Sequence, residues 1–94
     1  MASVAVKVSI PSLLAAATGG LREVEVHAET LSGAIARLVE KYPLLDVHLF
    51  DERRALRQHV HLFYNDQNTQ WLSDLDVALH QGDTLTVLQA VSGG

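Results

Sequence analysis

Several residue types and patterns that would define a function are absent from this sequence. Its 94 residues include no cysteine, which excludes a disulfide framework, a thiolate nucleophile and a cysteine-ligated zinc or iron–sulfur site. The longest uncharged apolar stretch near the start, 13–17, is far shorter than the roughly 20 residues that a membrane-spanning helix needs. We find no signal-peptide pattern and expect a cytoplasmic protein with no membrane partner.

Positive charge is missing from the C-terminal third of the chain. Every Lys and Arg lies at or before Arg57, and the net charge of −4 arises from four later carboxylates, Asp66, Asp74, Asp76 and Asp83. A nucleic-acid-binding protein neutralises phosphates with Lys and Arg, so we expect no nucleic-acid partner. The distribution favours a protein partner that presents basic residues to the C-terminal third.

The composition and the apolar pattern predict one small α+β domain. Hydrophobic residues make up 48% of the chain and charged residues 19%, which is typical of a folded domain and not of a disordered chain. Apolar and polar residues alternate in short segments, as they do in half-buried strands. The expected strands cover 3–10, 21–28, 59–64, 70–72 and 84–88.

One amphipathic helix is expected between the second and third strands. Thr30 is a suitable N-cap, and Pro43 is expected to end the helix. The apolar side chains between them repeat at helical spacing: Leu31, Ile35, Leu38 and Tyr42. A mixed sheet of four to five strands, covered on one face by this main helix, buries these residues, with the first and last strands paired in parallel.

The remaining segments are expected to be irregular. We predict a loop over 11–20, a short helical turn and loop over 44–57, and a helical turn over 75–79. Asn65-Asp66 and Gly82-Asp83 are typical turn sequences.

The chain ends in Ala90-Val91-Ser92-Gly93-Gly94, and a terminal Gly-Gly arises by chance in about 0.5% of chains. With the strand–strand–helix–strand order, this ending makes the chain resemble the ubiquitin-like β-grasp family of bacterial sulfur carriers, the MoaD/ThiS family, and within it the carriers for cysteine synthesis. The resemblance implies a β-grasp domain over 1–89 and a flexible tail over 90–94. Further matching pieces are Val8-Ser9-Ile10-Pro11, Thr18-Gly19-Gly20, Tyr42-Pro43, Asn65-Asp66 and Gly82-Asp83.

The resemblance implies a protein cosubstrate and not an enzyme. In this family an activating enzyme related to ubiquitin E1 uses ATP and Mg²⁺ to adenylate the terminal carboxylate, which is that of Gly94 here, and a sulfur donor converts it to a thiocarboxylate. A second partner accepts the sulfur: a cysteine synthase-like enzyme or the large subunit of molybdopterin synthase. We expect no bound cofactor and no metal in the chain itself.

Two surfaces are candidates for contact with these partners. The first is the tail, where glycine allows the backbone to thread a narrow channel: Ala90, Val91, Ser92 and Gly93. The second is the sheet face away from the helix. If Val60, Leu62 and Tyr64 face the helix, Phe63 and Leu88 face outward and form a docking patch.

Other interpretations stay open at this point. The chain is also compatible with the small subunit of molybdopterin synthase, with a carrier for another sulfur-containing metabolite, and with a ubiquitin-like modifier whose Gly94 forms isopeptide bonds. His59 and His61 have a spacing compatible with metal binding, but a solvated strand face is favoured. Trp71 is expected in the core or at a sheet edge.

Overall fold

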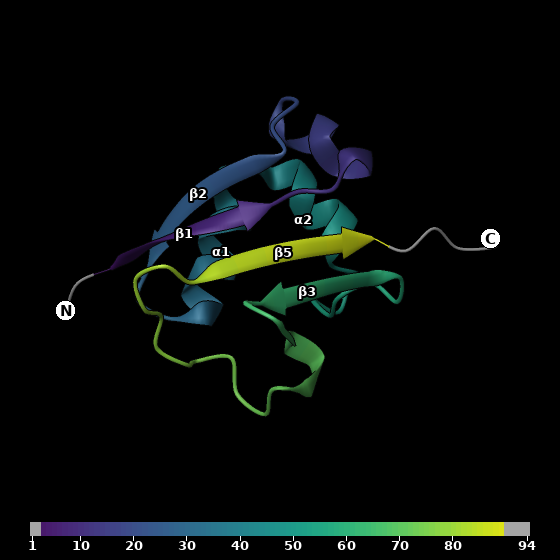
Figure 1. Ribbon diagram of the computed structural model, residues 1–94. Coiled ribbons are helices and arrows are strands. Elements are labelled where there is room, and N and C mark those ends of the chain that lie inside the picture. Colours follow the sequence, from purple (N-terminus) through teal and green to yellow (C-terminus); the bar gives the residue numbers. More distant parts are fainter. Residues whose placement is uncertain (1–2, 90–94) are drawn as a thin grey trace.

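Helices α1 and α2 cover one face of a five-stranded sheet in the computed structural model, which describes residues 3–89; Figure 1 looks onto the opposite face. No helix in this range is long and apolar enough to cross a membrane. The elements in chain order are β1 (Val4–Ser9), the 3₁₀ helix η1 (Ser12–Thr18), β2 (Glu23–Ala28), α1 (Leu31–Lys41), α2 (Pro43–Leu49), β3 (Val60–Tyr64), β4 (Gln67–Asn68), the 3₁₀ helix η2 (Thr69–Trp71) and β5 (Thr84–Gln89).

The strand order is β2-β1-β5-β3-β4, with β1 and β5 paired in parallel at the centre. The three other pairs are antiparallel. The parallel central pair and the mixed sheet are those that the sequence pattern predicts, so the expected α+β architecture is confirmed. Because β5 lies between β1 and β3, the strand that precedes the C-terminal residues is hydrogen-bonded on both sides (Figure 1).

The core lies between the sheet and the two α-helices. Val6 and Val8 of β1, Leu85 of β5, and Leu31 and Leu38 of α1 have no exposed surface. All five belong to the inward sets that strand alternation and helical spacing predict. Burying a side chain of this size contributes about 1.5–3 kcal/mol, so the contact between the two layers supplies much of the hydrophobic stabilisation.

The start of α1 confirms the predicted cap. Thr30 has extended backbone angles, and its Oγ1 accepts a hydrogen bond from the N–H of Gly33 at 3.1 Å. This bond satisfies one of the N–H groups that a helix leaves without an internal partner in its first turn. The local sequence therefore sets where α1 begins.

The segment before β5 corrects a prediction. The N–H groups of Leu31 and Ser32 donate to the carbonyls of Val77 and Leu75 at 3.0 and 2.8 Å. The helical turn expected over 75–79 is wrong, because these carbonyls bind the first turn of α1 and are not available for a turn of their own.

The expected loop over 11–20 is also wrong, since η1 occupies most of it. Leu14 is 3% exposed and anchors η1 in the core. The Thr18 hydroxyl donates to the carbonyl of Leu21 at 2.7 Å. Gly19 ends η1 with a φ of 73°, in the left-handed region that glycine adopts without a steric penalty.

Two further elements differ from their predicted form. Pro43 ends α1 as predicted but also begins α2, because a proline at the first position of a helix lacks only an N–H that has no partner there. The strand expected over 70–72 is replaced by β4, which lies earlier in the chain and contains only two residues. Gln70 and Trp71 belong instead to η2.

Candidate functional site

The described part of the chain ends with β5, and the residues expected to carry the chemistry follow directly after it in the sequence. Gln89, the last residue of β5, lies opposite Val60 of β3. The tail lies outside the described residues, and the roles of its members stay predictions: Ala90, Val91, Ser92, Gly93 and Gly94. The described surface that adjoins the end of β5 is therefore the part of the expected site that the structure can define.

Phe63 of β3 and Leu88 of β5 lie on the sheet face away from α1, as their alternation predicts. Their neighbours Leu62 and Val87 are 2% and 1% exposed and face the core, and side chains alternate between faces along a strand. Leu88 is 46% exposed, whereas Phe63 is partly buried. Phe63 lies opposite Thr86, which makes it a diagonal neighbour of Leu88 on this face.

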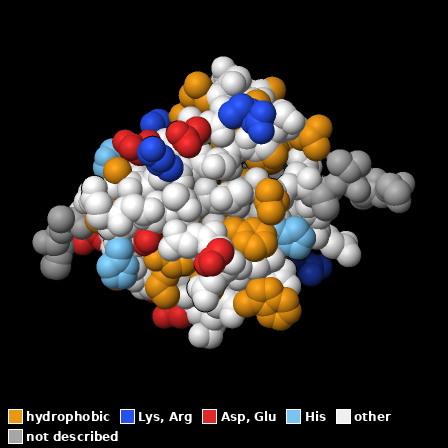
Figure 2. Space-filling view, viewed as in Figure 1, with side chains coloured by type: hydrophobic (Ala, Val, Ile, Leu, Met, Phe, Trp, Pro, Cys, Tyr) orange, Lys and Arg blue, Asp and Glu red, His pale blue; other side chains and the backbone are white. Residues whose placement is uncertain are grey.

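Trp71 extends this apolar surface. Its side chain is 78% exposed, so the alternative that placed it in the core is wrong; it lies at the sheet edge, in η2 directly after β4. Trp71 and Phe63 line the same hollow, of about 340 Å³, and hydrophobic side chains gather on this side of the sheet in Figure 2. We call Phe63, Trp71 and Leu88 the outer apolar patch.

His61 borders the outer apolar patch. It lies opposite Leu88 in the β3–β5 register, and its Nδ1 lies 3.2 Å from the amide nitrogen of Asn68. The Asn68 amide is oriented by its oxygen, which accepts from the N–H of Gln70 at 3.0 Å, so its nitrogen donates to His61. Within residues 3–89, no three His, Cys, Asp or Glu side chains come together in a way that could hold a metal ion.

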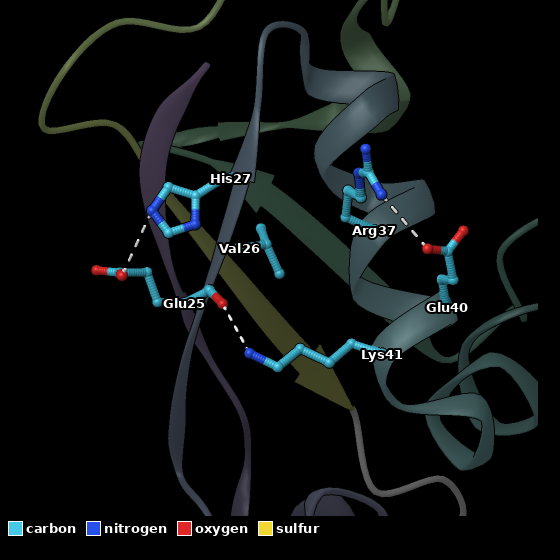
Figure 3. Close-up of a pocket in the computed structure, with 6 residues that line it drawn as sticks. All are labelled: Glu25, Val26, His27, Arg37, Glu40 and Lys41. Carbon is cyan, nitrogen blue, oxygen red and sulfur yellow. Dashed lines mark hydrogen bonds and ion pairs between the residues drawn. The ribbon is translucent and has the colours of Figure 1, made fainter. Parts of the chain in front are cut away.

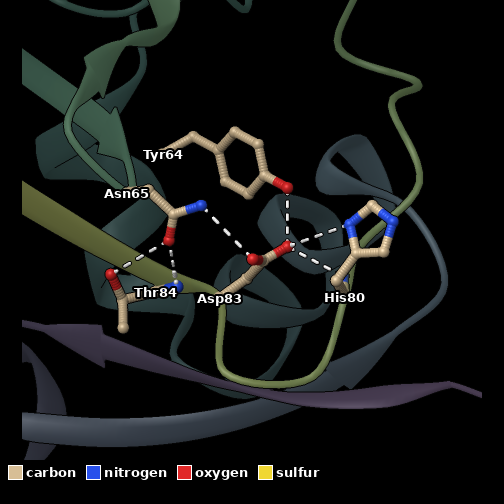
Figure 4. A network of polar contacts seen from close by, with 5 residues as sticks. All are labelled: Tyr64, Asn65, His80, Asp83 and Thr84. Carbon is tan, nitrogen blue, oxygen red and sulfur yellow. Dashed lines mark hydrogen bonds and ion pairs between the residues drawn. The ribbon is translucent and has the colours of Figure 1, made fainter.

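A polar network fixes the opposite end of β5 (Figure 4). Asp83 Oδ2 accepts hydrogen bonds from the Tyr64 hydroxyl at 2.6 Å and from the backbone N–H of His80 at 2.8 Å, and its Oδ1 accepts from the Asn65 amide at 3.2 Å. The Asn65 oxygen in turn accepts from the N–H of Thr84 at 2.9 Å. These bonds join the β3–β4 turn to the start of β5.

The network shifts the pKa values of Tyr64 and Asp83, the two residues that share its shortest hydrogen bond. Although burial alone raises the pKa of Asp83, the hydrogen bonds from Tyr64, His80 and Asn65 together lower it below its usual value. The bond to Asp83 is the main reason that the pKa of Tyr64 rises to about 12. Both shifts follow from a hydroxyl that donates to a carboxylate, and they mark a structural contact at the end of β5 remote from Gln89.

A polar groove of about 460 Å³ lies between β2 and α1 (Figure 3). Its charged side chains interact with groups inside the groove: Arg37 pairs with Glu40 at 3.4 Å, and His27 pairs with Glu25 at 3.8 Å. Lys41 donates to the backbone carbonyl of Glu25 at 3.4 Å. Of these three contacts, the one from Lys41 joins the free edge of β2 to α1, whereas the two ion pairs each lie within one element. The outer apolar patch, which adjoins the end of β5, is the better candidate for partner contact.

The fold defines a class of protein, the ubiquitin-like β-grasp domains. A mixed sheet with a parallel central pair, crossed on one face by its main helix, is the architecture that the resemblance implies. The chain belongs to the ThiS family, whose family model matches residues 8–94. Both the predicted fold class and the predicted family are therefore confirmed.

Individual relatives match nearly the whole chain. The sulfur carrier protein CysO of Mycobacterium tuberculosis is 34% identical over 91 residues, which cover 95% of this chain and 98% of the relative. Among solved structures, that of the Amycolatopsis orientalis BexX/CysO complex matches with a TM-score of 0.80 and 32% identity, covering 95% of this chain and 99% of that one. The small archaeal modifier protein 1 (SAMP1) of Methanosarcina acetivorans matches with a TM-score of 0.77 and 28% identity, covering 98% of each chain.

Proposed function

We propose that this protein is a sulfur carrier of cysteine biosynthesis, a protein cosubstrate that carries sulfur on Gly94. The observation that carries the proposal is the similarity to CysO over 95% of the chain, in a family match that runs through the terminal Gly93-Gly94. An E1-like activating enzyme and a cysteine synthase-like acceptor are the proposed partners. We assign the reaction to the cytoplasm because the activation consumes ATP.

The chemistry explains why an activating enzyme is required. An α-carboxyl group has a reference pKa of about 3.5, so it is ionised at neutral pH and is a poor electrophile. In the proposed reaction the Gly94 carboxylate attacks the α-phosphorus of ATP and pyrophosphate leaves. Hydrosulfide supplied by the sulfur donor then attacks the acyl carbon, AMP leaves with the bonding electron pair, the sulfur loses its proton, and the thiocarboxylate remains. Mg²⁺ on the activating enzyme neutralises charge on the phosphates.

The absence of cysteine agrees with this role. With no thiol in the chain, no internal nucleophile competes with the sulfur donor for the acyl adenylate. The only sulfur nucleophile that the protein offers after activation is the thiocarboxylate itself. A sulfur-accepting synthase therefore receives its sulfur from one defined position.

The proposal is tested by intact-mass analysis after incubation with a purified E1-like activating enzyme, ATP, Mg²⁺ and a sulfur donor. We expect the mass change for one oxygen replaced by sulfur. Gly94→Ala places a methyl group beside the carbonyl under attack and is expected to abolish thiocarboxylate formation while the unfolding midpoint stays unchanged. Glu40→Gln, on the exposed side of α1, is the control and retains the product. A normal yield from Gly94→Ala contradicts the proposal.

A second candidate, a ubiquitin-like modifier, is favoured by the similarity to SAMP1 of M. acetivorans, which is a small archaeal modifier protein. In that role the activated Gly94 carbonyl forms an isopeptide bond with a lysine amine instead of accepting sulfur. The same mass analysis separates the two functions, because lysine-linked adducts of the target proteins replace the sulfur-for-oxygen change. Transfer of sulfur to a pterin precursor in place of a cysteine precursor indicates the molybdopterin branch.

A further inference from the structure

Trp71 is held outside the core on a rigid turn. Its neighbour Thr69 is 5% exposed, and the Asn68 side chain caps η2 through the N–H of Gln70. The N–H of Leu72 closes the turn on the carbonyl of Thr69 at 3.1 Å. These bonds fix the backbone that carries an indole 78% exposed, so a partner that contacts the ring orders one side chain and not the whole segment.

The hollow beside Trp71 is apolar on one side and polar on the other. Trp71, Phe63 and Leu72 supply apolar walls, whereas Asp66, Gln67 and Asn68 supply polar ones. Asp66 is exposed and belongs to the tight turn between β3 and β4. The hollow therefore places a single carboxylate next to an exposed aromatic ring.

Asp66 is the carboxylate of the C-terminal third that remains free within the described residues. Asp83 accepts three hydrogen bonds, Asp76 accepts from the Ser32 hydroxyl, and Asp74 accepts from the N–H of Asp76 at 2.9 Å. Between residues 3 and 89, no hydrogen bond or ion pair involves the Asp66 side chain. No ion pair of residues 3–89 uses this exposed carboxylate, so its negative charge is available to a cationic side chain of a partner.

We propose that this hollow binds an arginine side chain of the activating enzyme, with the guanidinium stacked on Trp71 and paired with Asp66. Arginine fits better than lysine because its planar guanidinium stacks on an indole and forms a two-point contact with a carboxylate. Its aliphatic stem lies against Phe63 and Leu72. The assignment of the partner rests on the proposed function. Phe63 lines the hollow and is a diagonal neighbour of Leu88, which lies one residue before the end of β5. An enzyme that receives the tail and covers Leu88 and Phe63 therefore reaches the hollow.

The test uses the single tryptophan of the chain. Fluorotryptophan-labelled protein gives one fluorine NMR signal, and it is titrated with purified activating enzyme in the absence of ATP. We expect the Trp71 signal to shift on binding. Trp71→Ala is expected to raise the Kd by about tenfold, as truncation of an interface tryptophan does. Trp71→Phe is expected to restore part of the affinity, and Leu44→Ala, whose side chain is 61% exposed on α2, is the control.

Asp66 is tested by charge. Asp66→Asn keeps the shape of the side chain and is expected to raise the Kd by about fivefold and to make it less sensitive to salt. Glu40→Gln makes the same charge change on α1 and is expected to leave the Kd unaltered. If Asp66→Asn binds with the affinity and salt response of the unaltered protein, or if the Trp71 signal does not move, the arginine subsite is wrong.

The outcome is separable from that of the proposed function. Thiocarboxylate formation by the unaltered protein, together with normal binding of both variants, overturns the subsite and leaves the carrier function intact. A Trp71 shift and weakened variants with no gain of sulfur support the subsite and contradict the carrier function.

Discussion

At the scale of single residues, a hydrogen bond couples the ionisation of Tyr64 to that of Asp83 (Figure 4). The 2.6 Å bond between them raises the pKa of Tyr64 to about 12. A group whose pKa is higher in the folded than in the unfolded protein stabilises the fold below its unfolded pKa, which is about 10 for tyrosine, and loses that contribution as pH rises through the folded value. The fold is therefore expected to weaken between about pH 10 and pH 12.

Tyr64→Phe tests this pH dependence. The variant keeps the ring but has no hydroxyl to ionise, so its unfolding free energy is expected to be lower at neutral pH by about 1.5–3 kcal/mol, which is typical of a hydrogen bond to a charged group. Its additional loss of stability between about pH 10 and pH 12 is expected to be smaller than that of the unaltered protein. Urea unfolding across this range measures both. Parallel curves for the two proteins contradict the coupling.

Leu88 allows a clean test of the outer apolar patch in the reaction itself. Its side chain is 46% exposed, so Leu88→Ser removes apolar contact area without opening a cavity in the core. We expect a several-fold higher KM for the carrier in the adenylation reaction and an unchanged kcat. Leu21→Ser is the matched control, since Leu21 is 49% exposed and lies before β2. Equal KM values for the two variants contradict docking at the patch.

The orientation of residues on a regular pattern was predictable from the sequence, whereas the high exposure of Trp71 at the sheet edge was not. Phe63 and Leu88 are placed outward by the alternation of two strands that are confirmed. Trp71 follows a strand of only two residues, so no alternation extends to it. Its exposure is decided by the buried Thr69 and the cap from Asn68, which are contacts of a turn and have no sequence period.

At the scale of elements, the N–H groups in the first turn of α1 donate hydrogen bonds to acceptors from two different parts of the chain. The Thr30 side chain supplies one, and backbone carbonyls of Leu75 and Val77, far along the chain, supply others. The cap is local and was predicted. The hydrogen bonds to the two carbonyls were not predicted, because a segment that pairs with the end of a helix far away in the sequence has no local pattern to identify it. The same reason explains why 75–79 was expected to form a helical turn.

Thr30→Ala tests the contribution of the local cap. The variant removes the acceptor of the Gly33 N–H and is expected to lower the unfolding free energy by about 1 kcal/mol, within the range of 0.5–2 kcal/mol known for such caps. Thr30→Ser retains the oxygen and is expected to stay within about 0.5 kcal/mol of the unaltered protein. Chemical unfolding monitored by circular dichroism gives both values. An equal loss in both variants indicates that the threonine methyl group, and not the cap, is what matters.

At the scale of the whole molecule, the layers and the central parallel pair follow from the order of apolar stripes. In contrast, η1 and the full length of α2, where only a short helical turn was predicted, required knowledge of the packed core. Leu14 of η1 and Leu45 and Leu49 of α2 are buried, yet each lies in a segment too short to display a period. The two helices fill the end of the core that α1 leaves uncovered. The sheet face opposite them keeps the outer apolar patch exposed (Figure 2).

The charge distribution leads to a prediction about the whole molecule. All Lys and Arg residues lie at or before Arg57, and the later residues carry only negative charge. If this acidic part attracts a basic activating enzyme, association is accelerated at low salt. Raising the ionic strength from about 0.01 M to about 0.15 M shortens the Debye length from about 30 Å to about 8 Å. We expect the association rate constant to fall by about tenfold or more, with little change in dissociation.

A stopped-flow measurement of association across this salt range checks the prediction, and two variants locate its origin. Asp74→Asn removes one negative charge from the acidic third and is expected to flatten the dependence of the association rate on salt. Glu40→Gln removes the same charge from the part of the chain where Lys and Arg balance the carboxylates, and the rate is expected to change less. Equal slopes for the two variants show that total charge and not its position steers the encounter, and a rate that does not depend on salt contradicts electrostatic steering altogether.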